Sequence, residues 1–203
     1  MEYGSRIRFV IITIVAVVLL VLSTWGVIAL ARNIFGGSNK AKTATSSQKI
    51  ELSDYDRAGT VVKLNVDGPI VGDGQYVSYQ IEVSQNYRKI TAYKGYEKTV
   101  VSEKQYDNNV EAYRTFLRAL DRQNYTTKVS GSSDDEVAAC ATGRRFVYSL
   151  TDQEETVSRL WNTSCTSKVG SMVSSTGTSV RSLYKSQIPD YNTILVKEYS
   201  ILK

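Results

Sequence analysis

Residues 76–84 read YVSYQIEVS, and this stretch decides the fold class. Apolar or aromatic side chains occupy positions 77, 79, 81 and 83, whereas polar side chains occupy positions 78, 80 and 82. An alternation with a period of two is typical of a β-strand that buries one face and exposes the other. The sequence therefore predicts a half-buried strand here, within a sheet.

Further stretches with strand character lie on both sides of this one. They are predicted at 60–66, 87–94, 97–105, 125–129, 144–150 and 156–164. Short turns such as Gly72-Asp73-Gly74 and Gln85-Asn86 separate neighbouring stretches, which favours antiparallel hairpins.

Two stretches show the period of a helix instead. Residues 109–123 carry an apolar stripe at positions 113, 116, 117 and 120, and Asn108 with Glu111 predicts a capping box at the start. A second helix is predicted at 171–187, before Pro189. The order of strands, helix, strands and helix predicts an α+β domain in which two helices pack on one face of an antiparallel sheet.

An apolar run near the N-terminus predicts where the chain is located. Residues 9–31 hold no charged side chain across 23 positions. As a helix they would rise roughly 35 Å, enough to cross a hydrocarbon core of about 30 Å. Ala29-Leu30-Ala31 also resembles a cleavage site, so a cleaved secretory signal is the alternative. The length of the run favours a retained signal-anchor.

Domain boundaries follow from this anchor. We predict a cytoplasmic tail at 1–8, a transmembrane helix at 9–31, a flexible linker at 32–59 and an extracytoplasmic α+β domain at 60–203. Basic residues flank both ends of the span, so the positive-inside rule gives no clear orientation. A short tail inside and a long exported domain is the ordinary arrangement for a signal-anchor. We therefore expect a single-pass protein of the cell membrane whose C-terminal domain lies outside the cytoplasm.

Two cysteines, Cys140 and Cys165, lie in the predicted extracytoplasmic domain. An even pair in an oxidising compartment is most simply a disulfide, and its loop of about 26 residues would contribute on the order of 3 kcal/mol to stability. A metal site and a reactive thiol are the alternatives. The chain contains no histidine, whereas zinc sites need about four Cys or His ligands, so the disulfide is favoured.

Catalytic groups are few. Without histidine, the chain cannot form a Ser-His-Asp or Cys-His arrangement. Ser182 and Lys185 match the S-x-x-K spacing of a Ser-Lys pair, but companion motifs are missing and such a match is expected by chance. The carboxylates at 134–136 and 154–155 lie next to one another in predicted turns, where they stay solvated, and the first group lacks the spacing of a calcium loop. We expect a protein that is not an enzyme and holds no cofactor or metal.

Charge and tyrosine content indicate surfaces that could bind a partner. The formal net charge of +5 is a mild basic bias without a dense Lys/Arg cluster, so nucleic acid is not expected. Arg114, Arg118 and Arg122 recur at every fourth position of the first predicted helix and form a candidate anion-binding row, which neighbouring acidic residues partly offset. Many of the 14 tyrosines lie in the meander at 76–106, either as sheet structure or as a recognition face.

Part of the domain resembles a group of known sequences. The residues that carry the likeness are Cys140, Gly143-Arg144-Arg145-Phe146, Leu160-Trp161, Cys165 and Gln187-Ile188-Pro189-Asp190-Tyr191. This pattern is similar to that of small membrane-anchored envelope proteins of Saccharibacteria-like, candidate-phyla bacteria, which are uncharacterised. The resemblance covers most of the exported domain. It implies an envelope location and transfers no activity and no site residue.

The anchor, the linker, the predicted disulfide and the lack of catalytic groups together indicate one class of function. We expect a binding or assembly module of the cell envelope that contacts the lipid bilayer through residues 9–31. Its expected partner is another envelope protein or an anionic polymer. An envelope hydrolase or transferase that works without histidine, and a protein inhibitor of hydrolases, are the alternatives.

Overall fold

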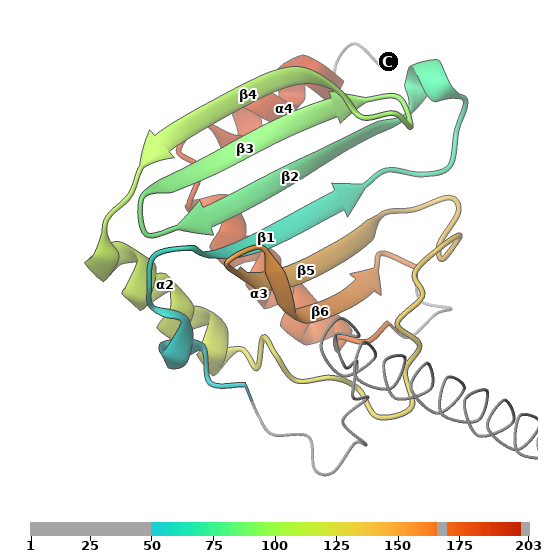
Figure 1. The fold of residues 1–203 in the computed structure, drawn as a ribbon. Helices are drawn as coiled ribbons and strands as arrows, with labels where there is room; N and C mark the ends of the chain where they lie inside the picture. Colours follow the sequence, from blue (N-terminus) through green and yellow to red (C-terminus); the bar gives the residue numbers. More distant parts are fainter. Residues whose placement is uncertain (1–49, 166–169, 200–203) are drawn as a thin grey trace, which may run out of the picture. The chain divides into compact units, whose positions relative to one another are not determined.

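The computed structural model describes residues 50–165 and 170–199 (Figure 1). Its elements are η1 (Leu52–Tyr55), β1 (Thr60–Asp67), η2 (Asp73–Gln75), β2 (Val77–Ser84), β3 (Tyr87–Lys94), β4 (Thr99–Asp107), α2 (Val110–Arg122), β5 (Arg145–Asp152), β6 (Glu155–Thr163), α3 (Ser174–Ser186) and α4 (Tyr191–Tyr199). The predicted tail at 1–8, the membrane span at 9–31 and most of the linker lie outside the described residues. Within the described ranges, no helix is long and apolar enough to cross a membrane.

Six strands form one antiparallel sheet in the order β4-β3-β2-β1-β5-β6. β1 lies in the middle, where it pairs with β2 on one side and with β5 on the other. β2, β3 and β4 form a meander, and β5 and β6 form a hairpin. The predicted α+β class with an antiparallel sheet is therefore confirmed.

Alternation along the strands sends one set of side chains into the core. Val62, Leu64 and Val66 of β1 are buried, whereas the positions between them are half-buried. Leu64 lies opposite Ile81 of β2 and Tyr148 of β5, so the apolar sides of three strands share one face. Each large apolar side chain removed from water contributes about 1.5–3 kcal/mol, which makes this face the main source of stability.

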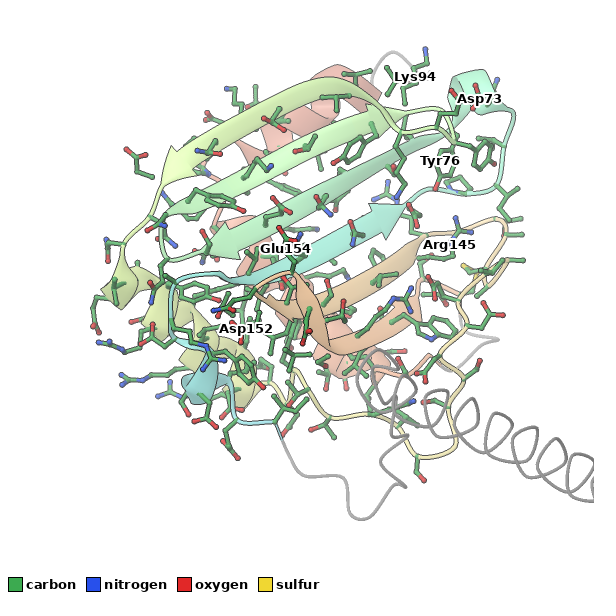
Figure 2. The ribbon with its side chains drawn as sticks, in the orientation of Figure 1. Asp73, Tyr76, Lys94, Arg145, Asp152 and Glu154 are labelled. Carbon is green, nitrogen blue, oxygen red and sulfur yellow. A yellow bond between two sulfur atoms is a disulfide. The ribbon has the colours of Figure 1, made fainter. Side chains whose placement is uncertain are left out.

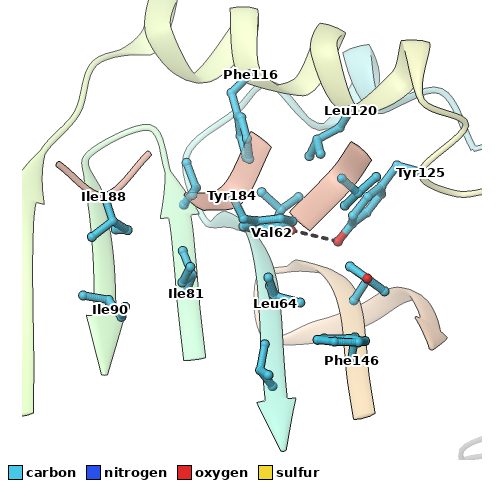
Figure 3. Packing of buried hydrophobic residues seen from close by; sticks show 14 of the residues in the cluster. Val62, Leu64, Ile81, Ile90, Phe116, Leu120, Tyr125, Phe146, Tyr184 and Ile188 are labelled. Atoms are coloured by element: carbon cyan, nitrogen blue, oxygen red, sulfur yellow. Dashed lines mark hydrogen bonds between the residues drawn. The ribbon is translucent and has the colours of Figure 1, made fainter. Parts of the chain in front are cut away.

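α3 and α4 lie behind the strands in Figure 1, and α2 lies at the end of the sheet where β1 begins, so the helices close the apolar core. α2 contributes Phe116 and Leu120 to the core, and α3 contributes Tyr184 (Figure 3). The rings of Phe116 and Tyr184 meet edge to face at 5.4 Å, so the two helices also pack on each other. This arrangement follows from the apolar stripe of α2, whose four buried residues all point to the sheet side.

The prediction of two helices is wrong, because the structure contains a third, α4. Pro189 lacks a backbone N–H and separates α3 from α4. Ile194 and Leu195 of α4 join the core, with 5% and 9% of their surface exposed. Because these two residues are neighbours rather than one turn apart, the tail shows little helical periodicity.

The start of α2 differs from the predicted capping box. Asn109, and not Asn108, is the N-cap, and its side chain accepts a hydrogen bond from the backbone N–H of Ala112 at 2.9 Å. Asn108 instead donates through its side-chain amide to the carbonyl of Ser84 at 2.6 Å. Glu111 therefore does not act in a capping box and instead forms an ion pair with Arg114 of the same helix.

Two further boundaries differ from the prediction. The predicted strand at 125–129 consists of turns and irregular backbone, because the hydroxyl of Tyr125 is drawn into the core to donate to the carbonyl of Ser149 at 3.0 Å. The predicted linker extends too far, because Leu52 in η1 is fully buried in the core. The folded domain therefore begins before Thr60.

The predicted disulfide between Cys140 and Cys165 is present, with 5.5 Å between the two Cα atoms. It joins the loop before β5 to the end of β6. Next to it, the backbone N–H of Ser164 donates to the carbonyl of Arg144 at 2.9 Å and the hydroxyl of Ser164 accepts from the N–H of Arg144. The bridge thus closes one end of the β5–β6 hairpin.

Candidate binding surfaces

The open face is the side of the sheet turned away from the three helices, toward the viewer in Figures 1 and 2. Glu82 lies near its centre, where Lys63 and Lys89 approach its carboxylate oxygens at 2.9 and 3.1 Å. Burial pushes the pKa of Glu82 upward, but the hydrogen bonds and charges of the two lysines outweigh it, so the pKa lies below its ordinary value. Lys89 also lies 3.9 Å from Glu103. The two lysines and two glutamates of this cluster therefore balance in charge.

A strap at residues 128–143 covers the β5–β6 part of the open face. It shields Trp161, whose indole N–H donates to the carbonyl of Ser133 at 2.9 Å. Arg159 donates to the carbonyl of Asp134 at 3.2 Å and pairs with Glu136, while Lys128 pairs with Asp134. The predicted acidic turn at 134–136 is therefore partly used to hold the strap. Among the described residues, no three side chains of the metal-binding types lie together.

The tip is the end of the sheet formed by the β1–β2 loop, the β3–β4 turn and the first residues of β4. Three of its apolar or aromatic side chains are widely exposed, namely Ile70 (47%), Tyr96 (46%) and Val100 (55%). β1 runs from the end where the described chain begins toward this tip, which lies on the right of Figure 1. Exposed apolar side chains gathered at one end of the sheet make the tip a candidate interaction site.

Hydrogen bonds hold the loops of the tip in place. The hydroxyl of Tyr96 donates to the carbonyl of Val71 at 2.8 Å, and the backbone N–H of Tyr96 donates to the carboxylate of Asp73 at 2.7 Å. The backbone N–H of Ile70 donates to the carbonyl of Ala141 at 2.7 Å, which connects the tip to the disulfide loop. The apolar side chains are therefore exposed on a backbone that is already ordered.

Tyr76 forms the floor of the tip (Figure 2). Its ring stacks on that of Tyr96, with 4.1 Å between the centroids and 15° between the planes. Burial and the neighbouring carboxylate of Asp67 raise the pKa of Tyr76 to about 12, although Arg145 opposes this shift. Lys98 of the β3–β4 turn lies 3.6 Å from Asp67. The tip thus rests on a buried, neutral phenol rather than on a catalytic group.

A hollow of about 580 Å³ lies where α3 ends and α4 begins. Ser182 and Lys185, the predicted S-x-x-K match, both line it. The Nζ atom of Lys185 lies 5.3 Å from the centre of the Tyr191 ring. Within the described part of the chain, Ser182 and Lys185 share no hydrogen bond, so the hollow does not contain an assembled Ser-Lys pair.

The predicted row of arginines on α2 is divided. Arg114 is engaged, because its guanidinium lies 2.6 Å from Asp56 and 2.7 Å from Glu111. Arg118 and Arg122 are exposed on the surface of the same helix. Arg114 therefore connects α2 to the segment before β1, and an anion-binding row through all three residues stays a prediction.

No protein-family model matches the chain, and no curated protein matches it either.

The sequence pattern does not indicate the tip or the hollow as sites. Gly72-Asp73-Gly74 indicates a turn, and Tyr96 is one of many tyrosines, so neither shows that Ile70 and Tyr96 become neighbours. Their proximity depends on the pairing of β2 with β3, which places two connections at one end of the sheet. The hollow depends on α4, which has no clear sequence pattern.

Proposed function

We propose that this chain is a membrane-anchored, extracytoplasmic module of the cell envelope that binds another envelope protein through its tip. The apolar run at 9–31 and the polar linker support anchoring, and the disulfide between Cys140 and Cys165 fits an oxidising compartment. The exposed apolar side chains of the tip, held on ordered loops, are the observation that carries the binding function.

The chemistry of the tip favours a protein over a polysaccharide or a lipid. Protein interfaces combine an apolar centre with aromatic side chains, as Ile70, Val100 and Tyr96 do here. Asp73 and Lys98 supply charged groups of both signs around them. Because the loops are already ordered, little conformational entropy is lost on binding.

Affinity purification of the full chain with and without tip substitutions tests this proposal. Ile70→Glu and Tyr96→Ala should each lower the amount of a co-purifying envelope protein at least about tenfold, since each removes a central apolar contact. Val173→Glu is the matched control, because Val173 is 50% exposed but precedes α3. Equal recovery with Ile70→Glu and Val173→Glu would contradict the proposal.

An inhibitor of a hydrolase is the second candidate, and one observation favours it. The loop from Cys140 to Arg144 is exposed at Ala141 and Thr142, yet the disulfide and the bond from Ile70 hold it. In this case the partner at the tip would be a hydrolase, and adding the full chain would inhibit the co-purified enzyme.

A hydrolase activity of the chain itself is tested separately. Because Lys185 lies over Tyr191 rather than on Ser182, we expect a serine-reactive activity probe to leave Ser182 unlabelled. Specific labelling at Ser182 that is lost in Lys185→Gln would establish an enzyme instead of a binding module.

A further inference from the structure

β4 is an edge strand of the sheet, and its outer side is open. In the strand order it pairs with β3, and within the described ranges no other strand pairs with it (Figure 1). All of its residues are exposed or half-buried. The backbone N–H and C=O groups along such an edge can pair with a further strand.

The other edge of the sheet is covered along much of its length. The backbone N–H of Trp161 in β6 donates to the hydroxyl of Ser171 at 2.8 Å, and the carbonyl of Trp161 accepts from the N–H of Met172 at 2.9 Å. The strap at 128–143 lies over the same residue. β4 has no comparable cover from the described residues, so it is the edge on which a strand can be added.

The pairing with β3 shows which backbone groups of β4 point outward. Beyond the end of β4, the N–H of Asn108 donates to the carbonyl of Asn86 at 3.0 Å. In an antiparallel ladder only every second pair of opposite residues exchanges hydrogen bonds. Counting back from Asn108, the backbone N–H and C=O groups that point away from β3 are those of Glu103, Gln105 and Asp107.

Two of these residues also place carboxylates along the edge, on the open face. Glu103 lies opposite Thr91, whose hydroxyl donates to it at 3.1 Å, and Lys89 lies 3.9 Å away. Asp107 is exposed, and its backbone carbonyl accepts from the guanidinium of Arg88 at 3.1 Å. The edge therefore combines outward backbone groups with two carboxylates four residues apart.

A second copy of β4 fits this edge poorly. An antiparallel pair of β4 strands that is centred on Glu103 or on Lys104 sets like charges directly opposite each other. A pair centred on Gln105 sets Glu103 opposite Asp107. Like charges at opposite positions destabilise a strand pair, and the bulge at Val101 bends the strand. The strand that fits this edge therefore comes from another protein and carries the opposite charge.

We propose that β4 accepts an extended segment of another protein as an added antiparallel strand. Lys or Arg side chains four residues apart on this segment would lie opposite Glu103 and Asp107. An apolar side chain at its C-terminal end would contact Val100, which is 55% exposed. The inference rests on the proposed function, because Val100 belongs both to β4 and to the tip, and it names the chemistry of the segment that the partner supplies.

Fluorescence anisotropy on the full chain in an uncharged detergent tests this mode of binding. The probe is a labelled, capped peptide Lys-Val-Thr-Val-Lys-Thr-Val, whose first, third and fifth residues would lie opposite Asp107, Gln105 and Glu103. N-methylation of the third residue should weaken binding at least about tenfold, because the methyl group replaces a hydrogen-bond donor and prevents the strands from approaching to about 4.8 Å. N-methylation of the fourth residue is the matched control, since that N–H would point away from β4, and it should change the affinity less than about twofold.

A substitution in the chain tests the charge complementarity. Asp107→Lys should weaken binding of the same peptide at least about threefold, because it sets like charges opposite each other. Glu155→Lys is the matched control, since Glu155 is an exposed carboxylate at the start of the other edge strand. The circular dichroism spectrum of each variant checks that the sheet is retained.

The pattern of these affinities decides the outcome. Weaker binding with the third residue methylated and with Asp107→Lys, together with unchanged binding in both controls, supports the proposal. Absence of saturable binding, equal effects of the two methylated peptides, or equal effects of Asp107→Lys and Glu155→Lys would overturn it. The peptide assay uses no native partner, so its failure would leave the co-purification test of Ile70→Glu standing, and a failure of that test would leave the peptide result standing.

Discussion

At the scale of single residues, buried tyrosines determine much of the core. The hydroxyls of Tyr125 and Tyr184 lie 3.0 Å apart inside the protein, and Tyr125 also bonds to the carbonyl of Ser149. A buried hydroxyl without a partner is costly, so these bonds fix how α3 and the loop after α2 meet the sheet. Alternation in the sequence shows which tyrosines turn inward but not which partner their hydroxyls find.

The first prediction concerns this pair of tyrosines. Tyr125→Phe should lower the free energy of unfolding by about 1–2 kcal/mol, because it removes the donor to Ser149 and leaves Tyr184 with one partner fewer. Urea unfolding measures the change. Tyr93→Phe, on the half-exposed part of β3, should change the free energy by less than about 0.5 kcal/mol. Equal losses for the two variants would contradict this assignment.

The second prediction concerns alkaline pH. Burial raises the pKa of Tyr76 and Tyr148 to about 12 in the folded protein, above the unfolded value of about 10. A raised pKa means that the folded state favours the protonated phenol, so this contribution is complete below about pH 10 and is lost as the pH rises from 10 to 12. Absorbance at alkaline pH should show exposed tyrosines that ionise first and a late group that ionises together with unfolding. If all tyrosines ionised in a single transition at a pH below that of unfolding, this prediction would be contradicted.

At the scale of elements, the strands and α2 could be predicted because their patterns are local. β2 alternates between apolar and polar residues over its eight positions, and α2 carries a stripe at helical spacing. α4 could not be predicted, since Ile194 and Leu195 are adjacent and the sheet beneath them supplies the reason for their burial. The tip could not be predicted from the sequence either, because the exposure of Ile70 depends on contacts between distant loops.

The β5–β6 turn provides the third prediction. Gln153 and Glu154 both have positive φ angles, of 46° and 72°, which is the conformation that Asn-Gly turns adopt most easily. Gln153→Asn combined with Glu154→Gly should therefore raise the free energy of unfolding by about 0.5–1 kcal/mol. Urea unfolding measures the free energy of this double variant. Thr156→Asn, which introduces an asparagine beside the turn rather than in it, is the comparison variant. A loss of stability in the double variant would contradict the turn geometry.

The disulfide provides the fourth prediction. Replacing Cys140 and Cys165 by alanine should lower the free energy of unfolding by about 3 kcal/mol, because the unfolded chain regains the freedom of a closed loop. The strap at 128–143 should then be cleaved faster by protease, since exposed ion pairs such as Lys128–Asp134 contribute little. Unchanged cleavage of the strap in this alanine variant would show that other contacts hold it.

At the scale of the whole molecule, the two ends of the sheet differ in what they present to the surface. The described chain enters beside η1, where Arg114 and Asp56 hold the segment before β1. The opposite end carries the tip, with Ile70 and Tyr96 exposed on ordered loops. In the proposed function, the tip is the end of the sheet that contacts the partner. The charge-balanced open face and the α3–α4 hollow are separate from both.

Site-specific photocrosslinking in intact cells tests this account most directly. A photoreactive amino acid in place of Ile70 should yield a crosslink to one envelope protein, whereas the same group in place of Val173 should not. A membrane-impermeant reagent should also reach the crosslinked pair from outside the cell. Crosslinks from position 173 but not from position 70, or partners that are cytoplasmic proteins, would contradict the proposed role of the tip.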